Sequence, residues 1–166
     1  MSVLDRVEGT IKTAVVTVSD TRTKETDKGG RKVLGYLQEM NVEVDASDYI
    51  IVKDDREEIS RTVENLAAGG LDAIITTGGT GIAARDVTIE AVRPLFDKEI
   101  EGFGEIFRML SFTEDIGSRS ILSRAVAGAI GSTAVFTLPG STGAVTLAME
   151  RLVVPELNHC VHELHK

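Results

Sequence analysis

The sequence lacks several residue types, and each absence excludes a class of protein. The 166 residues contain no Trp and only 4% aromatic residues, which disfavours a stacking platform for single-stranded nucleic acid. Cys160 is the only cysteine, so no internal disulfide can form, and a reducing compartment fits best. No apolar run reaches the length of a membrane span, and the charged start MSVLDRVEGT has no signal-peptide core. We therefore expect a cytoplasmic protein that binds neither membrane nor nucleic acid.

The charge balance limits the partners further. A net charge of −8 opposes a broad surface for polyanions. It leaves room for one small anion, because backbone N–H groups and one or two Arg side chains can make a local positive pocket. Three scattered prolines mark no boundary, and no linker is visible. The chain is therefore expected to form one domain over residues 1–166.

Hydrophobic patterning predicts alternating strands and helices. The predicted strands cover residues 11–18 and 71–77, and another lies within 44–52 and ends in YIIV. Two more, joined by a tight Gly-Ser turn, lie within 125–138. The predicted helices cover residues 28–40, 56–68, 88–96, 102–112, 142–154 and 156–164. Pro94 is expected to bound or kink its helix, and Pro155 to open the last one. The alternation favours a three-layer α/β fold: a mostly parallel sheet, helices on both faces, and an antiparallel strand pair near the C-terminal part.

Three of the apolar strands end in small or hydroxyl-bearing residues. AVVTV is followed by Ser19-Asp20-Thr21-Arg22, AIITT by Gly78-Gly79-Thr80-Gly81, and AVFTL by Pro139-Gly140-Ser141-Thr142-Gly143. One glycine-rich turn alone is explained by a tight bend. Three of them at the edge where parallel sheets bind ligands indicate a cradle of N–H groups and hydroxyls for phosphate. No P-loop run is present, and GTGIAA follows the third strand, which argues against a dinucleotide motif.

Acidic residues stand at the same edge. Asp54 and Asp55 follow the second predicted strand, and Asp86 follows the glycine loop. Asp55 is explained as the N-cap of the helix that begins at residue 56, and Asp86 could likewise cap the helix near residue 88. Two carboxylates beside a phosphate cradle repel the substrate unless a divalent cation lies between them, as Mg²⁺ commonly does. Asp54 and Asp86 are therefore candidate catalytic and Mg²⁺-binding residues of phosphoryl or nucleotidyl transfer.

Six segments together resemble the molybdopterin-binding MoaB/Mog family of molybdenum cofactor biosynthesis, most closely its stand-alone MoaB branch. They are TVSDTR, DKGG, DAIITTGGTGIAARDVTIEAV, EGFGEIFR, ILSRAVAG and LPGSTGA, in family order over about residues 11–160. The resemblance implies an adenylyltransferase that moves AMP from MgATP to the terminal phosphate of molybdopterin, giving adenylyl-molybdopterin and pyrophosphate. Mg²⁺ then accompanies ATP, and molybdopterin is a substrate. It also implies a homo-oligomer, trimer or hexamer, and the molybdenum-insertion enzyme as a partner.

The resemblance assigns roles to particular positions. It gives Asp54 and Asp86 the task of organising Mg²⁺ and the triphosphate. The residues expected to line the substrate and nucleotide site are Ser19, Asp20, Arg22, Gly78, Gly79, Thr80, Gly81, Arg85, Pro139, Gly140, Ser141 and Gly143. Arg85 is a phosphate contact or a tether for its neighbour Asp86. Ser123 and Arg124 either reach the pterin or have a structural role at a helix end.

Some features depart from the family pattern or admit two interpretations. Lys53 stands where many relatives have proline, and LPGST where many have Leu-Pro-Gly-Asn-Pro. Two alternatives to the transferase therefore remain: a non-catalytic molybdopterin carrier or scaffold, and a CinA-like nucleotide hydrolase. Phe103 and Phe107 belong either to the core or to a contact between subunits. The three C-terminal histidines do not form an obvious metal site, because His159 and His165 point about 120° apart on a helix.

Overall fold

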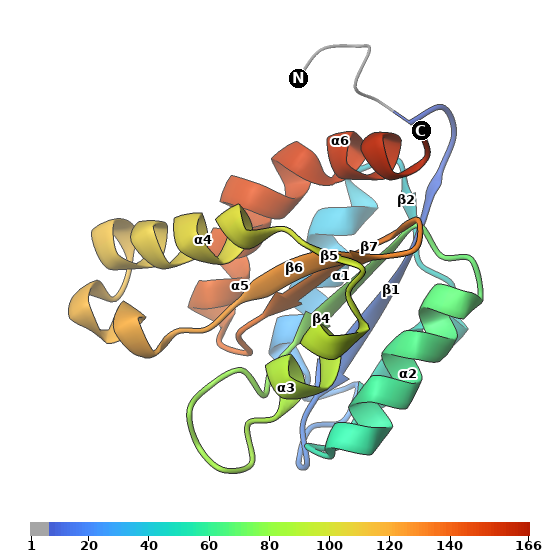
Figure 1. The fold of residues 1–166 in the computed structure, drawn as a ribbon. Helices are drawn as coiled ribbons and strands as arrows, with labels where there is room; N and C mark the ends of the chain where they lie inside the picture. Colours follow the sequence, from blue (N-terminus) through green and yellow to red (C-terminus); the bar gives the residue numbers. More distant parts are fainter. Residues whose placement is uncertain (1–6) are drawn as a thin grey trace.

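The computed structural model describes residues 7–166, in which a seven-stranded sheet lies between two layers of helices (Figure 1). The strand order is β2-β1-β4-β7-β6-β5, and β3 also pairs with β1. The strands are β1 (Ile11–Val18), β2 (Val42–Glu43), β3 (Tyr49–Val52), β4 (Ala73–Thr77), β5 (Lys98–Glu99), β6 (Val126–Ile130) and β7 (Thr133–Leu138). Every pairing is parallel except those of β6 with β7 and with β5. The predicted mostly parallel sheet with an antiparallel pair is confirmed.

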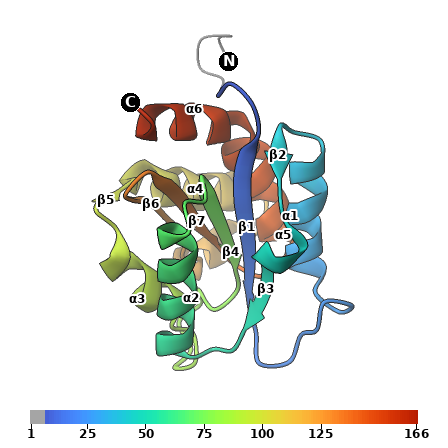
Figure 2. The same ribbon diagram turned by 90° about the vertical axis from the view of Figure 1, so that its right-hand side faces the viewer.

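Helices cover both faces of the sheet (Figure 2). On one face lie α1 (Lys28–Gln38), α4 (Glu101–Glu114), α5 (Thr142–Ala148) and α6 (Val154–Leu164). On the other lie α2 (Arg56–Ala68) and α3 (Thr88–Val92). All residues of β4 and β7 are buried, which explains why these strands read as apolar runs without alternation.

Two apolar clusters hold the layers together. Val15 of β1 faces the cluster under α1 and α4, while its neighbour Val16 faces the cluster under α2, as the two-residue period of a strand requires. Phe103 and Phe107 are buried in the first cluster, and the Phe103 ring meets Phe136 edge-on with ring centroids 5.5 Å apart. Both phenylalanines therefore belong to the core of the chain.

Local signals set several helix boundaries. The Asp55 side chain accepts a hydrogen bond from the Glu58 N–H at 2.9 Å and caps α2. Gly69 stands at the other end as the C-cap, so α2 has the predicted bounds. The predicted helix over 88–96 is shorter: α3 ends at Val92, and Pro94 lies in a 3₁₀ turn (Arg93–Leu95).

The strand expected within residues 44–52 is present as β3, which consists of the predicted YIIV, and Asp45 caps a 3₁₀ turn (Ala46–Asp48) before it. The last two helices form one continuous run, in which a π-helical turn (Met149–Val153) precedes Pro155, a residue that lacks an N–H donor. The short strands β2 and β5 and the 3₁₀ segment Gly117–Leu122 were not predicted. Within residues 7–166, each helix is too short or too polar to cross a bilayer.

Candidate active site

The loops that follow β1, β4 and β7 meet at one edge of the sheet, as predicted. Gly78 donates its N–H to the Leu138 carbonyl at 3.0 Å, which ties the β4 loop to the end of β7. Gly78 has φ +92°, and a Cβ there would lie 2.4 Å from the Val18 carbonyl oxygen. A Cβ on Gly140 would lie 3.1 Å from the Gly78 Cα. The glycines are therefore required because backbone packs directly on backbone at this edge.

A cavity of about 390 Å³ opens between these loops and the start of α1. Its lining consists of Thr17, Val18, Ser19, Arg22, Asp27, Lys28, Gly29, Thr77, Gly78, Gly140, Ser141 and Thr142. Arg22 and Lys28 are the basic side chains of this cavity, which we call the basic cavity. The N-termini of α1 and α5 both face it, and helix N-termini attract anions.

A buried carboxylate holds the floor of the basic cavity. Asp27 accepts hydrogen bonds from the Thr17 and Tyr49 hydroxyls, both at 2.6 Å, and caps α1 through the Gly30 N–H at 2.9 Å. The Thr17 hydroxyl uses its single proton in the bond to Asp27, so the Thr77 hydroxyl, 3.2 Å away, donates to Thr17. Burial raises the pKa of Tyr49, and its bond to Asp27 raises it further. The sequence analysis missed this network, although an Asp just before a helix is a common N-cap signal.

A second, smaller pocket of about 170 Å³ lies on the other side of the β1 loop. It is lined by Val18, Ser19, Asp20, Thr21, Asp54, Gly79, Arg85 and Asp86, and we call it the acid pocket. Burial raises the pKa of the Asp54 carboxyl, the negative charges of Asp20 and Asp86 raise it further, and Arg85 opposes them. The predicted approach of Asp54 to Asp86 is therefore confirmed.

The glycine loop, Gly78-Gly79-Thr80-Gly81, lies beside both pockets. A groove of about 290 Å³ runs along it and is lined by Gly78, Gly79, Thr80, Gly81, Asp86, Leu122, Ser123, Arg124, Pro139, Gly140 and Ser141. The loop is held from the first residue of α3, because the Thr88 hydroxyl donates to the Gly78 carbonyl at 2.9 Å and the Thr88 N–H to the Gly79 carbonyl at 3.0 Å.

Comparison with known proteins identifies the family. A profile of the family described as "Probable molybdopterin binding domain" matches residues 14–159. The chain belongs to this molybdopterin-binding family. Over 161 residues it is 59% identical to Molybdenum cofactor biosynthesis protein B of Staphylococcus carnosus, covering 97% of this chain and 95% of that protein.

Solved structures agree with this placement in the MoaB branch. A crystal structure of Molybdenum cofactor biosynthesis protein B superposes with a TM-score of 0.89 and 52% identity, over 96% of this chain and 99% of that one. The tungsten cofactor synthesizing protein MoaB of Pyrococcus furiosus superposes with a TM-score of 0.84 and 37% identity, over 96% and 100%. CinA of Thermoplasma acidophilum, at 17% identity and a TM-score of 0.60 over 91% and 98%, shares the fold alone.

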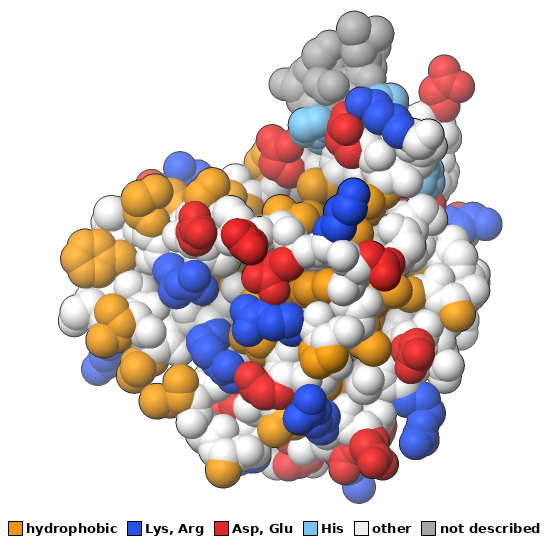
Figure 3. Space-filling model, viewed as in Figure 1, with side chains coloured by type: hydrophobic (Ala, Val, Ile, Leu, Met, Phe, Trp, Pro, Cys, Tyr) orange, Lys and Arg blue, Asp and Glu red, His pale blue; other side chains and the backbone are white. Residues whose placement is uncertain are grey.

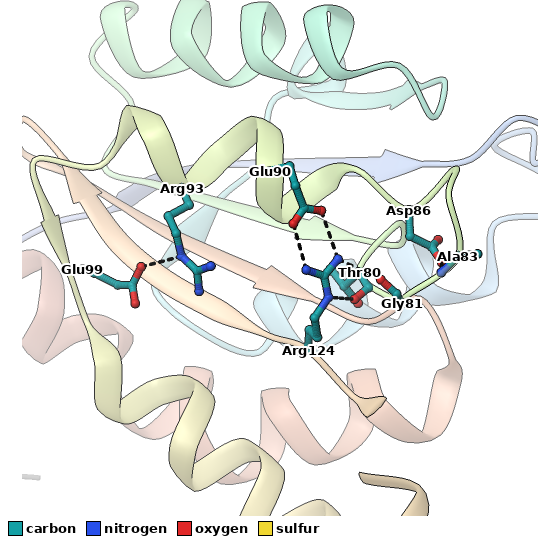
Figure 4. A network of polar contacts seen from close by, with 8 residues as sticks. All are labelled: Thr80, Gly81, Ala83, Asp86, Glu90, Arg93, Glu99 and Arg124. Atoms are coloured by element: carbon teal, nitrogen blue, oxygen red, sulfur yellow. Dashed lines mark hydrogen bonds and ion pairs between the residues drawn. The ribbon is translucent and has the colours of Figure 1, made fainter. Parts of the chain in front are cut away.

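Three expectations about site residues of this molybdopterin-binding family member need correction. Asp86 does not cap α3: its carboxylate accepts the Ala83 N–H at 3.0 Å within its own loop, and Val87 stands at the cap position (Figure 4). Gly143 follows Thr142 of the basic cavity but lies beside Asp115, outside the linings of the basic cavity, the groove and the acid pocket. Arg85 forms no ion pair with Asp86 among the described residues, although both line the acid pocket.

Other predicted site residues also lie at this edge of the sheet, and their binding roles stay predictions. Ser19 lines the basic cavity and the acid pocket, while Pro139 and Ser141 line the groove. Ser123 also lines the groove. The histidines lie far along α6, where His159 contacts Glu156 at 3.1 Å. Across residues 7–166, no group of three or more His, Cys, Asp or Glu side chains is placed to hold a metal ion.

The acid pocket nevertheless fits Mg²⁺ that arrives with a nucleotide. Mg²⁺ usually takes one or two protein carboxylates and fills its other positions with water and phosphate oxygens. Asp54 and Asp86 supply this number of carboxylates in one pocket. Burial raises the pKa of Asp54, the charges of Asp20 and Asp86 raise it further, and a cation between the carboxylates would relieve this repulsion.

Proposed function

We propose that this protein acts in cytoplasmic molybdenum cofactor biosynthesis as a molybdopterin adenylyltransferase. It transfers AMP from MgATP to the terminal phosphate of molybdopterin and releases pyrophosphate. The pathway is supported by the names of its relatives, which are molybdenum cofactor biosynthesis proteins. The reaction is supported by one observation above all: a basic cavity and an acid pocket share the residues Val18 and Ser19 as their common wall.

The opposite charges of the two sites assign the substrates. The acid pocket repels a bare phosphate, so it accepts a triphosphate only when a divalent cation comes with it, as in MgATP. The pterin phosphate needs no metal and belongs in the basic cavity, near Arg22 and Lys28. The two phosphates then meet beside the Gly78–Gly79 turn and the shared residues Val18 and Ser19, since Gly78 lines the basic cavity and Gly79 the acid pocket.

The chemistry requires positioning and charge neutralisation. A phosphate oxygen of molybdopterin forms a bond to the α-phosphorus of ATP, and the bond from that phosphorus to the β-phosphate oxygen breaks, so pyrophosphate leaves. Asp54 and Asp86 would hold Mg²⁺, which would neutralise charge on the triphosphate. N–H groups and hydroxyls around Gly78 and Ser141 bind phosphate oxygens. No side chain has to form a covalent intermediate.

The same proposal includes a homo-oligomer, a trimer or hexamer. Exposed apolar side chains gather on α4 and the 3₁₀ segment that follows it, which we call the α4 surface (Figure 3). They are Ile106, Met109, Phe112, Ile116, Ile121 and Leu122. Phe112 is 56% exposed and Ile121 80%, and such a concentration of apolar side chains is typical of a protein–protein contact. The activated pterin then passes to the molybdenum-insertion enzyme as the next partner.

A transfer assay with α-labelled ATP tests the reaction. The protein is mixed with molybdopterin, Mg²⁺ and labelled ATP, and adenylyl-molybdopterin is separated from AMP. Asp54→Asn and Asp86→Asn should each lower the rate by about 100-fold or more, since each removes a charge that organises the triphosphate. Asp55→Asn is the matched control, because Asn also caps helices and Asp55 lies outside the acid pocket.

The products distinguish the alternatives. Labelled adenylyl-molybdopterin that depends on Asp54 and Asp86 supports the transferase. Tight pterin binding with no labelled pterin shows a carrier. Labelled AMP formed without molybdopterin shows a nucleotide hydrolase, and either of these results refutes the proposal.

A further inference from the structure

Arg124 uses almost all of its hydrogen-bonding capacity on the protein itself (Figure 4). Its Nε donates to the Thr80 carbonyl at 2.9 Å, and Nη2 donates to the Gly81 carbonyl at 2.8 Å. Nη1 and Nη2 also donate to the two Glu90 oxygens at 2.8 and 3.0 Å. A guanidinium has five N–H donors, so these bonds leave one free. Arg124 lines the groove, yet it has little left to offer a phosphate.

These bonds set the direction of two successive peptide groups. In a trans peptide the C=O and the N–H point in opposite directions, and the described chain contains no cis peptide bond. Holding the Thr80 and Gly81 carbonyls toward Arg124 therefore directs the N–H groups of Gly81 and Ile82 away from it. A loop with three glycines has many other conformations, and the guanidinium removes much of this freedom before a ligand binds.

Glu90 keeps the guanidinium in this role. It lies on α3, whose first residue, Thr88, already binds the glycine loop. The Arg124 hydrogen bond lowers the pKa of Glu90, so the carboxylate stays ionised and the fork-to-fork pair persists. A negative carboxylate beside the guanidinium also makes this spot unfavourable for a phosphate.

We propose that Arg124 is a positioning residue, anchored by Glu90, that holds the glycine loop in its ligand-binding conformation and makes no phosphate contact. The expected effect of Arg124 on catalytic rate rests on the proposed adenylyl transfer, whereas the expected effect of Arg124 on the loop conformation does not. Asp86 follows the glycine loop in the same connection between β4 and α3 and binds the Ala83 N–H there, so loosening the loop also misplaces this proposed catalytic carboxylate.

Hydrogen exchange and kinetics on a small set of variants test the proposal. Arg124→Lys keeps the charge but cannot reach two carbonyls and a carboxylate together. Glu90→Gln keeps the shape and removes the anchor's charge. In both variants, the backbone amides of residues 79–83 should exchange roughly tenfold faster or more when no substrate is bound. Both variants should also lower kcat more than they raise KM for ATP.

Arg93→Lys is the matched control, because the Arg93–Glu99 pair at 2.8 Å lies beside α3 without touching the loop.

A direct phosphate contact predicts the opposite pattern. The Arg124→Lys variant would then keep much of the wild-type affinity for ATP. The Glu90→Gln variant would bind ATP more tightly than wild type, because a repelling carboxylate is gone. Either result, or unchanged amide exchange in both folded variants, overturns the proposal. If wild-type protein transfers no AMP, the adenylyltransferase is refuted while the exchange data still decide the role of Arg124. Circular dichroism melts establish that each variant is folded, and Glu90→Gln provides the test should Arg124→Lys not fold.

Discussion

Asp54 and Asp86 line one small pocket although they come from separate loops, one after β3 and the other after β4. Burial and the charges of Asp20 and Asp86 raise the pKa of Asp54, so the free protein holds its acids in a repulsive arrangement. This arrangement is costly for folding, and a bound cation would relieve the repulsion.

We therefore expect Asp54→Asn to stabilise the protein at neutral pH while it abolishes transfer. A carboxyl whose pKa is raised by folding contributes stability below its unfolded pKa, and this contribution is lost as pH rises through the folded pKa. At neutral pH the wild type thus carries a penalty that Asn removes. The gain is below about 1 kcal/mol, since solvent screens a half-exposed group. Urea unfolding should show the difference at pH 7 and none in acid; a destabilised Asp54→Asn at pH 7 would contradict the electrostatic account.

Gly78→Ala should be strongly destabilising, for two separable reasons. Gly78 has φ +92°, and the new Cβ would lie 2.4 Å from the Val18 carbonyl oxygen. The matched control is Gly70→Ala, which has φ +82° but no atom within 4 Å of its Cβ. Gly70→Ala should cost about 1–2 kcal/mol for the backbone conformation alone. Gly78→Ala should cost clearly more in denaturant unfolding, and equal costs would mean that the β1 and β4 loops are not in direct contact.

Two tyrosines provide a test of the buried Asp27 network. Tyr49 donates to Asp27 and Tyr36 donates to Glu150, each at 2.6 Å, but only Asp27 is buried. Tyr49→Phe leaves a buried carboxylate with one donor fewer and should cost about 1–3 kcal/mol of unfolding free energy. Tyr36→Phe should cost less than about 0.5 kcal/mol, because water replaces the lost bond. Similar costs for both variants would show that Asp27 does not depend on Tyr49.

The α4 surface should control the assembly. Phe112→Glu places a charge among exposed apolar side chains and should shift the molar mass, measured by light scattering, from oligomer to monomer. Ile82→Ser is a suitable control, because Ile82 is also exposed but lies in the glycine loop. An unchanged mass for Phe112→Glu would place the contact between copies elsewhere.

Particular residues show why part of the fold was predictable. The helix Arg56–Ala68 was predicted with its bounds because Asp55 and Gly69 are short-range signals. The two-residue β5 was missed, since its pairing with β6 depends on residues far away in the sequence. For the same reason the site was predicted only in part. The loops were located correctly, while Gly143 lies outside the linings of the basic cavity, the groove and the acid pocket.

The sequence by itself determined where bare backbone and acids gather, because the carboxyl ends of parallel strands lie at one edge whatever the detailed packing. Only the tertiary structure decided what each side chain does there. Arg124 binds two carbonyls and Glu90, and Asp27 binds two hydroxyls, through contacts between residues distant along the chain. Such contacts depend on the three-dimensional packing of loops, which no local pattern of residues encodes.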